Sequence, residues 1–158
     1  EFTMLDNPEI IQTEAQFAAV IRLTAPRHEI PHVMGPGIGE LMAAITSQGQ
    51  TPTGPIFSHH LRMDDPRTFD FEIGVPVASP ITAVGRVEPS QSPAATVART
   101  VDHGPYEGLG PAGSEFEAWV AAQGRTLAPD LWECYLSGPE LGPDPTSWRT
   151  QLSRPLIR

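Results

Sequence analysis

Two kinds of hydrophobic spacing alternate along the chain, in the same order in each half. Segments in which every second residue is apolar are typical of strands, and segments in which apolar residues recur every third or fourth position are typical of helices. In the first half the spacing predicts a helix near 31–48, with Pro31 in its first turn and Gly49 as its left-handed stop. The strands expected around this helix lie near 9–14, 17–25, 55–62 and 68–77.

Each predicted helix carries one apolar stripe that has to be buried. In the first helix the stripe has the spacing i, i+3, i+4, i+7 and consists of Ile38, Leu41, Met42 and Ile45. In the second helix, expected near 108–123, the stripe consists of Phe116, Trp119 and Val120, and Gly124 follows as the stop. The strands expected in the second half lie near 85–89, 94–102, 130–137 and 148–156.

The two halves also resemble each other residue by residue. Residues 39–49 echo residues 114–124, and Leu61 matches Leu136 at the same separation. Self-similarity of this kind indicates a repeated structural unit. We therefore expect a tandem βαββ repeat with a short leading strand in front of each copy. The first copy would cover about 8–77, a linker about 78–84, and the second copy about 85–157.

The length of the chain matches a single domain. With 158 residues it can bury roughly two-thirds of its unfolded surface. A small sheet with one helix cannot bury both of its faces, so the two copies should share one core. The expected fold class is α+β, with two antiparallel sheets that each carry one main helix, a pseudo-twofold axis between them, and a ligand cleft between the repeats. Residues 1–3 precede Met4 and are interpreted as a cloning remnant.

Composition excludes several classes of partner. The net charge is −9, with 10 Lys+Arg against 19 Asp+Glu, and the basic residues are not clustered, so direct binding to nucleic acid is not expected. No apolar run approaches the roughly 18 residues that a membrane span needs. The single cysteine, Cys134, cannot form an internal disulfide and is interpreted as a buried structural thiol. Because no export signal is seen either, the expected location is the cytoplasm, without membrane association.

Three local patterns suggest metal or phosphate chemistry, and each fails on geometry. Residues 28–32 match HExxH, but Pro31 belongs at a helix start, which leaves the first histidine outside the helix. The glycine-rich segment 35–39 lacks a preceding strand and a Lys-Ser/Thr ending. His59 and His60 are neighbours on a predicted strand and therefore point to opposite faces. No metal site and no cofactor are expected.

The strand near 130–137 carries the most informative residue, Glu133. Alternation places one set of side chains on one face of the strand, Leu131, Glu133 and Tyr135, and the other set on the opposite face, Trp132, Cys134 and Leu136. A carboxylate within an aromatic-rich strand is either solvated on an open sheet face or held in a pocket that needs a negative charge or a base. The strand alone leaves both interpretations open.

The repeat extends the argument from one strand to a candidate site. Ser58 and His60 occupy the positions in the first copy that Glu133 and Tyr135 occupy in the second. A groove between the copies would hold these four side chains. Only one of the four is a carboxylate, so the predicted site is asymmetric.

The segment 103–107 leads into the second predicted helix and contains Tyr106. One interpretation is a turn in which Gly104 and Pro105 set the backbone and Tyr106 packs over the helix start. The alternative is that Tyr106 forms an aromatic wall of the groove. Trp119 and Trp132 are further candidate walls, although both are equally suited to the core.

The order of these features resembles the GyrI-like effector-binding family, the small-molecule domain attached to many AraC-type and MerR-type multidrug-sensing regulators. The resemblance rests on the tandem βαββ repeat, on the turn at 103–107, on the pattern of Trp119 and Gly124, and on residues 133–136 followed by 138–139. Each motif alone is weak, but their order and spacing together are fairly specific. The resemblance extends over about 8–156.

The resemblance implies a binding protein with Glu133 at its centre. In the family, the matching glutamate lies in a cleft between the copies, where aromatic side chains stack on lipophilic and often cationic ligands. The implied role here is a free-standing protein that captures such compounds. The implied ligand-binding residues are Ser58, His60, Tyr106, Trp119, Trp132, Glu133 and Tyr135.

Two other functions stay open. One branch of the family resembles hydrolases of electrophilic, cyclopropane-bearing toxins, in which the residue matching Glu133 would activate water as a general base and Tyr135 or Tyr106 would orient the leaving oxygen. The sequence does not separate a binder from a hydrolase, because both use the same residues. Other free-standing members are described as gyrase inhibitors, so gyrase or a regulator is a candidate protein partner.

Overall fold

The computed structural model describes residues 5–62, 67–105, 108–137, 144 and 148–157. The strands of the first half are β1 (Glu9–Thr13), β2 (Gln16–Pro26), β3 (Phe57–Arg62) and β4 (Thr68–Pro76). Those of the second half are β5 (Glu88–Ser92), β6 (Ala95–His103), β7 (Thr126–Leu127), β8 (Leu131–Ser137) and β9 (Arg149–Ile157). The helices are α1 (Ile30–Ser47), which follows the short 3-10 turn η1 (Arg27–Glu29), and α2 (Leu109–Ala122).

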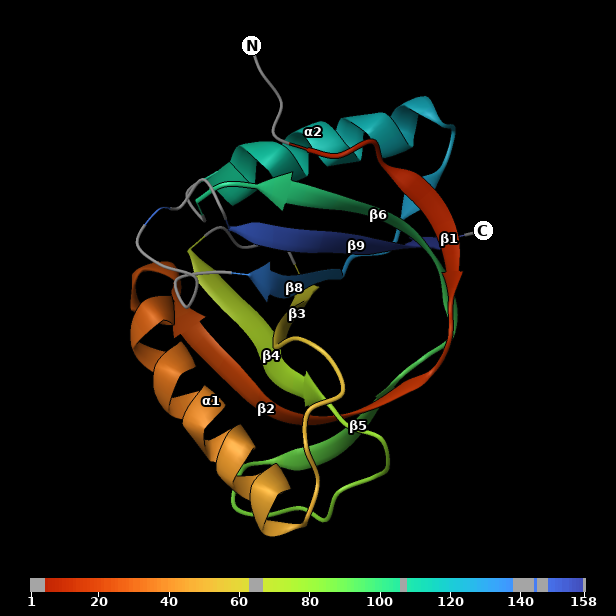
Figure 1. The fold of residues 1–158 in the computed structure, drawn as a ribbon. Coiled ribbons are helices and arrows are strands. Elements are labelled where there is room, and N and C mark those ends of the chain that lie inside the picture. Colours follow the sequence, from red (N-terminus) through yellow and green to blue (C-terminus); the bar gives the residue numbers. More distant parts are fainter. Residues whose placement is uncertain (1–4, 63–66, 106–107, 138–143, 145–147, 158) are drawn as a thin grey trace.

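These strands form one antiparallel sheet, so the α+β class is confirmed but the expected pair of separate sheets is wrong. The strand order is β1-β6-β9-β8-β3-β4-β2-β5, with β7 added beside β9. The halves are joined where β3 pairs with β8, from Phe57 opposite Cys134 to His60 opposite Leu131. Figure 1 shows the sheet curled like a half-barrel, with α1 and α2 both on its outer side. We call that side the outer face and the concave side the inner face.

The two halves exchange their leading strands. β1 pairs with β6 of the second half, and β5 pairs with β2 of the first. Thr13 of β1 lies opposite Ala95 of β6. Gln16 of β2, three residues after Thr13, lies opposite Ser92 of β5, three residues before Ala95, so the register of the first ladder continues into the second. Figure 1 shows β1 continuing into β2 as one curved band. The pseudo-twofold relation between the halves stays a prediction, but neither half completes its own sheet.

Most predicted elements agree with the structure to within one or two residues, and β5 is the main exception. It was expected at 85–89 and lies at Glu88–Ser92. The residues before it form a tight turn instead, in which Val84 and Val87 exchange backbone hydrogen bonds and Gly85 has a φ of 58°. A left-handed residue of this kind favours glycine and ends a strand. β7, with two residues, is too short to give a hydrophobic period.

Each helix buries its stripe against a separate part of the outer face. Under α1, Leu41 and Ile45 pack with Ile21 and Ile73, and all four are fully buried. The other two residues of that stripe, Ile38 and Met42, are partly buried at the edge of the same cluster. Under α2, the cluster consists of Phe116, Val120, Ala98, Leu131 and Leu152. The outer face is thus apolar under each helix, and the strands β3 and β8 lie between the two clusters.

On the inner face, an imidazole links the strands that join the two halves. The His59 side chain on β3 contacts the Asp130 carboxylate through Nε2 at 2.8 Å and the Glu72 carboxylate through Nδ1 at 3.5 Å. Its ring also stacks on Trp132 of β8, with centroids 3.8 Å apart. Burial alone would lower the pKa of His59, but the hydrogen bonds to Asp130 and Glu72 outweigh it and raise the pKa. The charged form therefore stabilises the junction.

We predict that His59→Gln destabilises the protein in a pH-dependent way. Hydrogen bonds to charged groups contribute about 1.5–3 kcal/mol each, so the loss in free energy of unfolding should be about 2 kcal/mol near pH 6. Because the folded pKa is raised, this contribution is complete below the unfolded value of about 6.5 and disappears as the pH rises through the folded pKa. Urea denaturation of both proteins at about pH 6, 7.5 and 9 measures the difference.

The exposed ion pair of Arg86 and Glu40 provides the control. Arg86→Gln should change the free energy of unfolding by less than about 1 kcal/mol at every pH, because exposed pairs are screened by solvent. A His59→Gln deficit that stays constant from pH 6 to pH 9 would contradict the proposed role of the charged imidazole.

Candidate functional site

Four polar side chains meet at the centre of the outer face, between the two helix-covered clusters. Ser58 and His60 come from β3, and Glu133 and Tyr135 come from β8. Ser58 lies directly opposite Glu133 in the ladder between these strands. Residues paired across antiparallel strands share a face, and His60 pairs with Leu131, which belongs to the cluster under α2. We refer to Ser58, His60, Glu133 and Tyr135 as the central cluster.

Hydrogen bonds connect the central cluster into a chain. The Tyr135 hydroxyl donates to Glu133 Oε1 at 3.1 Å and lies 2.7 Å from Ser58 Oγ. Since a hydroxyl carries one proton, Ser58 donates to Tyr135 when Tyr135 donates to Glu133. His60 Nε2 lies 3.4 Å from the same Glu133 oxygen. The contacts converge on Oε1 and leave Oε2 without a hydrogen-bond partner among the described residues.

The central cluster is largely shielded from water. Ser58 is 1% exposed and His60 is 7% exposed, while the Glu133 side chain is 14% exposed. The His60 ring packs against Phe69 and Phe71, with centroids 5.2 and 5.4 Å away. No arginine lies within ion-pair distance of Glu133 in the described part of the chain, which contains no lysine. Glu133 is therefore a mostly buried carboxylate without a permanent cationic partner.

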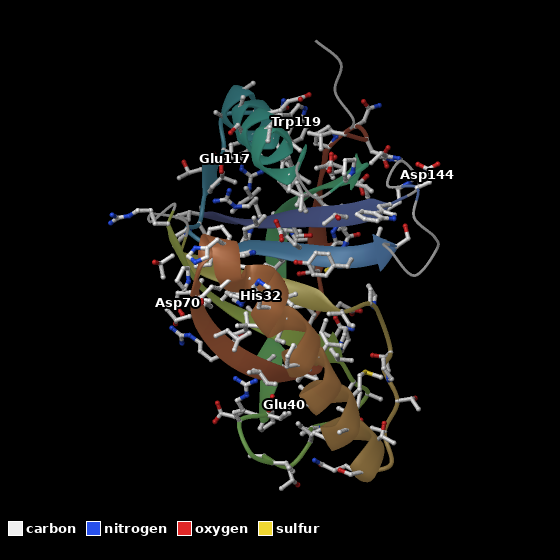
Figure 2. All side chains as sticks on the ribbon, turned by 90° about the vertical axis from the view of Figure 1, so that its left-hand side faces the viewer. His32, Glu40, Asp70, Glu117, Trp119 and Asp144 are labelled. Atoms are coloured by element: carbon white, nitrogen blue, oxygen red, sulfur yellow. The ribbon has the colours of Figure 1, made fainter. Side chains whose placement is uncertain are left out.

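The other three predicted site residues lie elsewhere or outside the described part of the chain. Trp132 is on the inner face, stacked on His59 and 5.1 Å from the Phe57 ring, so it does not border Glu133. Trp119 packs partly buried in the cluster under α2, which Figure 2 shows at the end of the molecule away from α1. Tyr106 lies outside the described residues.

Sequence reasoning missed two buried polar residues that extend the outer face. Thr150 on β9 lies opposite Tyr135 on one side and opposite Asp102 of β6 on the other. Thr150 is 0% exposed and Asp102 is 3% exposed. Burial raises the pKa of Asp102; nearby His103 opposes this shift and Glu133 adds to it. Alternation along β6 predicts that Asp102 shares a face of the sheet with Ala98. No sequence feature predicted that only β9 separates β6 from β8 in the sheet.

The structure offers no metal centre in the residues that it describes, and no group of three or more His, Cys, Asp or Glu side chains converges there. Burial raises the pKa of the Cys134 thiol, although Arg99 and a hydrogen bond with Gln151 oppose this, so the thiol form is favoured. Cys134 packs at the inner face beside Phe57. Leu136, which alternation places on the same face of the strand, is 45% exposed. Neither described helix combines the length and hydropathy needed to cross a membrane.

Comparison with known proteins identifies close structural relatives. The family model described as a GyrI-like small molecule binding domain matches residues 6–156. The crystal structure of the EcmrR C-terminal domain aligns with a TM-score of 0.86 at 21% identity, covering 96% of this chain and 98% of that chain. The EcmrR chain in the cryo-EM structure of the EcmrR–DNA complex also aligns with a TM-score of 0.86, at 20% identity. This alignment covers 98% of the present chain but only 58% of the EcmrR chain.

Two more distant structures share the fold. SAV2435 bound to tetraphenylphosphonium aligns with a TM-score of 0.65 at 12% identity, covering 96% of this chain and 94% of that chain. A structure described as a hydrolase from Listeria innocua aligns with a TM-score of 0.70 at 12% identity, covering 95% of this chain and 91% of that chain. No curated protein sequence matches the chain.

We predict that Tyr135→Phe destabilises the protein through Ser58. The substitution removes the hydroxyl 2.7 Å from Ser58 Oγ and leaves that buried hydroxyl without this partner. An unsatisfied buried polar group costs about 1–3 kcal/mol. Urea denaturation should show a loss of that size.

The double variant with Ser58→Ala tests the mechanism. Because it removes both hydroxyls, it should be at least as stable as Tyr135→Phe alone, which gives a coupling energy between the two sites. Strictly additive losses for the two substitutions would contradict a hydrogen bond between them.

Proposed function

The chain belongs to the GyrI-like small-molecule-binding family, and we propose that it captures lipophilic, cationic aromatic compounds with Glu133 as their counter-charge. The binding site would be a cleft on the outer face between the helices, above the central cluster. Ser58, Tyr135 and His60 would hold Glu133 in place, as positioning residues rather than as primary contacts.

One observation carries this proposal. Glu133 is a carboxylate with a side chain only 14% exposed and without an arginine at ion-pair distance among the described residues. Removing a charge from water without an opposite charge is costly, and removing one partner of a buried ion pair is destabilising for the same reason. A cationic ligand would supply the missing charge. The free Oε2 oxygen would be the atom that meets it.

The surroundings of Glu133 favour a delocalised cation over a small hydrated one. The Tyr135 hydroxyl contacts Glu133, and the Phe69 and Phe71 rings pack against His60. A cation over an aromatic face gains about 0.5–2 kcal/mol per ring once water is excluded. The binding of tetraphenylphosphonium by the structural relative SAV2435 supports this ligand class. The resemblance to the EcmrR C-terminal domain supports a role in effector binding.

We expect tetraphenylphosphonium to stabilise the wild-type protein in a thermal-shift assay. A ligand at about 100 times its Kd adds about 2.7 kcal/mol, which for a chain of this length corresponds to a rise in Tm of about 5–10 °C. Glu133→Gln should bind at least about tenfold more weakly, because it keeps the shape of the side chain and removes its charge.

Two matched controls isolate the charge. Tetraphenylborate has the same shape as tetraphenylphosphonium and the opposite charge, so it should not stabilise the wild-type protein. Glu88→Gln removes one exposed carboxylate from β5 and should behave as wild type. Equal stabilisation of wild type and Glu133→Gln by tetraphenylphosphonium would eliminate Glu133 as the counter-charge.

A second candidate function is hydrolysis of reactive, cyclopropane-bearing compounds with Glu133 as the general base. The observation that favours it is the contact of Glu133 Oε1 with the Tyr135 hydroxyl, which leaves Oε2 available to a water molecule. The hydrolase from Listeria innocua shares the fold and supports the same candidate. Glu133 would take a proton from the attacking water as the C–O bond forms and a ring C–C bond breaks, and Tyr135 would hold the carboxylate in position.

Mass spectrometry of an electrophilic cyclopropane incubated with the protein tests this function. Hydrolysis requires a product heavier by one water, formed by wild type and lost in Glu133→Gln. Product formation that survives in Glu133→Gln would rule out the general-base role, and no product at all would leave capture as the function of the site.

A further inference from the structure

The outer face contains a second polar region next to the central cluster. Thr150 has a fully buried Oγ1 that meets no hydrogen-bond partner in the part of the chain that the structure describes. Its neighbour Asp102 is 3% exposed, and its carboxylate accepts no hydrogen bond from any described residue. Most buried polar groups in native proteins have a partner, so two adjacent exceptions require an explanation.

The sheet register places these groups in a line with the central cluster. Tyr135 of β8, Thr150 of β9 and Asp102 of β6 lie opposite one another on three adjacent strands. Adjacent strands are about 4.8 Å apart, so the backbones of Tyr135 and Asp102 are separated by about 10 Å, with the Thr150 hydroxyl between them. Glu133 lies two residues from Tyr135 on the same face.

A purely structural role does not account for the pair. Among the described residues, neither the Asp102 carboxylate nor the Thr150 hydroxyl forms a hydrogen bond that would offset the loss of water from these groups. The two carboxylates, Asp102 and Glu133, also repel each other, which adds to the raised pKa that burial gives Asp102. Both costs would disappear if a molecule with hydrogen-bond donors and positive charge occupied the site.

We propose that Asp102 and Thr150 form a second recognition point, so that the preferred ligand is an aromatic dication with hydrogen-donating ends. Its first cationic group would meet Glu133, and the second would donate hydrogen bonds to the Asp102 carboxylate and the Thr150 hydroxyl. Amidinium and guanidinium groups have this chemistry, because they are planar and carry several N–H donors. The inference rests on the proposed function of Glu133 and adds a ligand class to it.

Binding of benzamidine and para-benzenediamidine, measured by isothermal titration calorimetry, tests the inference. The two probes share one aromatic ring and differ by one amidinium group. We expect the diamidine to bind wild type at least tenfold more tightly than benzamidine. Asp102→Asn should abolish this preference and change benzamidine binding less than twofold. Glu133→Gln should weaken both probes.

Two further variants separate recognition from stability and from net charge. Thr150→Val keeps the shape and removes the unpartnered hydroxyl, so it should be at least as stable as wild type and bind the diamidine several-fold more weakly. Glu88→Gln matches the charge change of Asp102→Asn at an exposed position and should retain the full preference.

The outcomes distinguish this inference from the function on which it rests. If benzamidine binds in a Glu133-dependent manner but the diamidine gains nothing, or keeps its gain in Asp102→Asn, the second recognition point is overturned and the proposed function stands. If neither probe binds wild type up to its solubility limit, the dication inference is overturned, and the tetraphenylphosphonium assay alone decides the role of Glu133.

Discussion

The pairing of β3 with β8 is the contact on which the rest of the structure depends. It joins the halves into one sheet and places Ser58 opposite Glu133, so that a carboxylate on one strand is held by groups that two strands supply. The same pairing positions His59 between carboxylates on the inner face. Without this pairing, β8 would be an edge strand and the Glu133 carboxylate would be solvated. A solvated carboxylate gains little from a cationic ligand, because water already stabilises its charge.

The charge distribution of the chain leaves no arginine beside this centre among the described residues. All ten basic side chains other than histidine are arginines. Several of them form ion pairs with carboxylates that lie away from the central cluster. Arg22 pairs with Asp70, Arg86 with Glu40, and Arg154 with Glu117. Arginine is well suited to such fixed pairs, because its planar guanidinium binds a carboxylate through two hydrogen bonds. The side chains that contact Glu133 are instead the Tyr135 hydroxyl, at 3.1 Å, and His60 Nε2, at 3.4 Å.

Local patterns predicted the elements and the central cluster, whereas long-range pairing lay beyond them. Alternation alone grouped Ser58 with His60 and Glu133 with Tyr135, because the direction of a side chain depends only on its own strand. The same rule separates Trp132 from Glu133, so its inclusion among the site residues came from its residue type and not from the pattern. Asp102 and Thr150 were missed because their position depends on which strands become neighbours, and periodicity carries no information about that. The single curled sheet was missed for the same reason.

The exchange of leading strands sets the order in which this chain can acquire structure during synthesis. β2 lacks its outer neighbour until β5 has been made, and β1 stays unpaired until β6 follows, more than eighty residues later. The first half therefore leaves the ribosome with open sheet edges on both sides of its three-stranded core. Such contacts between distant residues make folding slow and expose strand edges to other chains. The architecture that unites the binding site thus makes the nascent protein dependent on rapid completion of its second half.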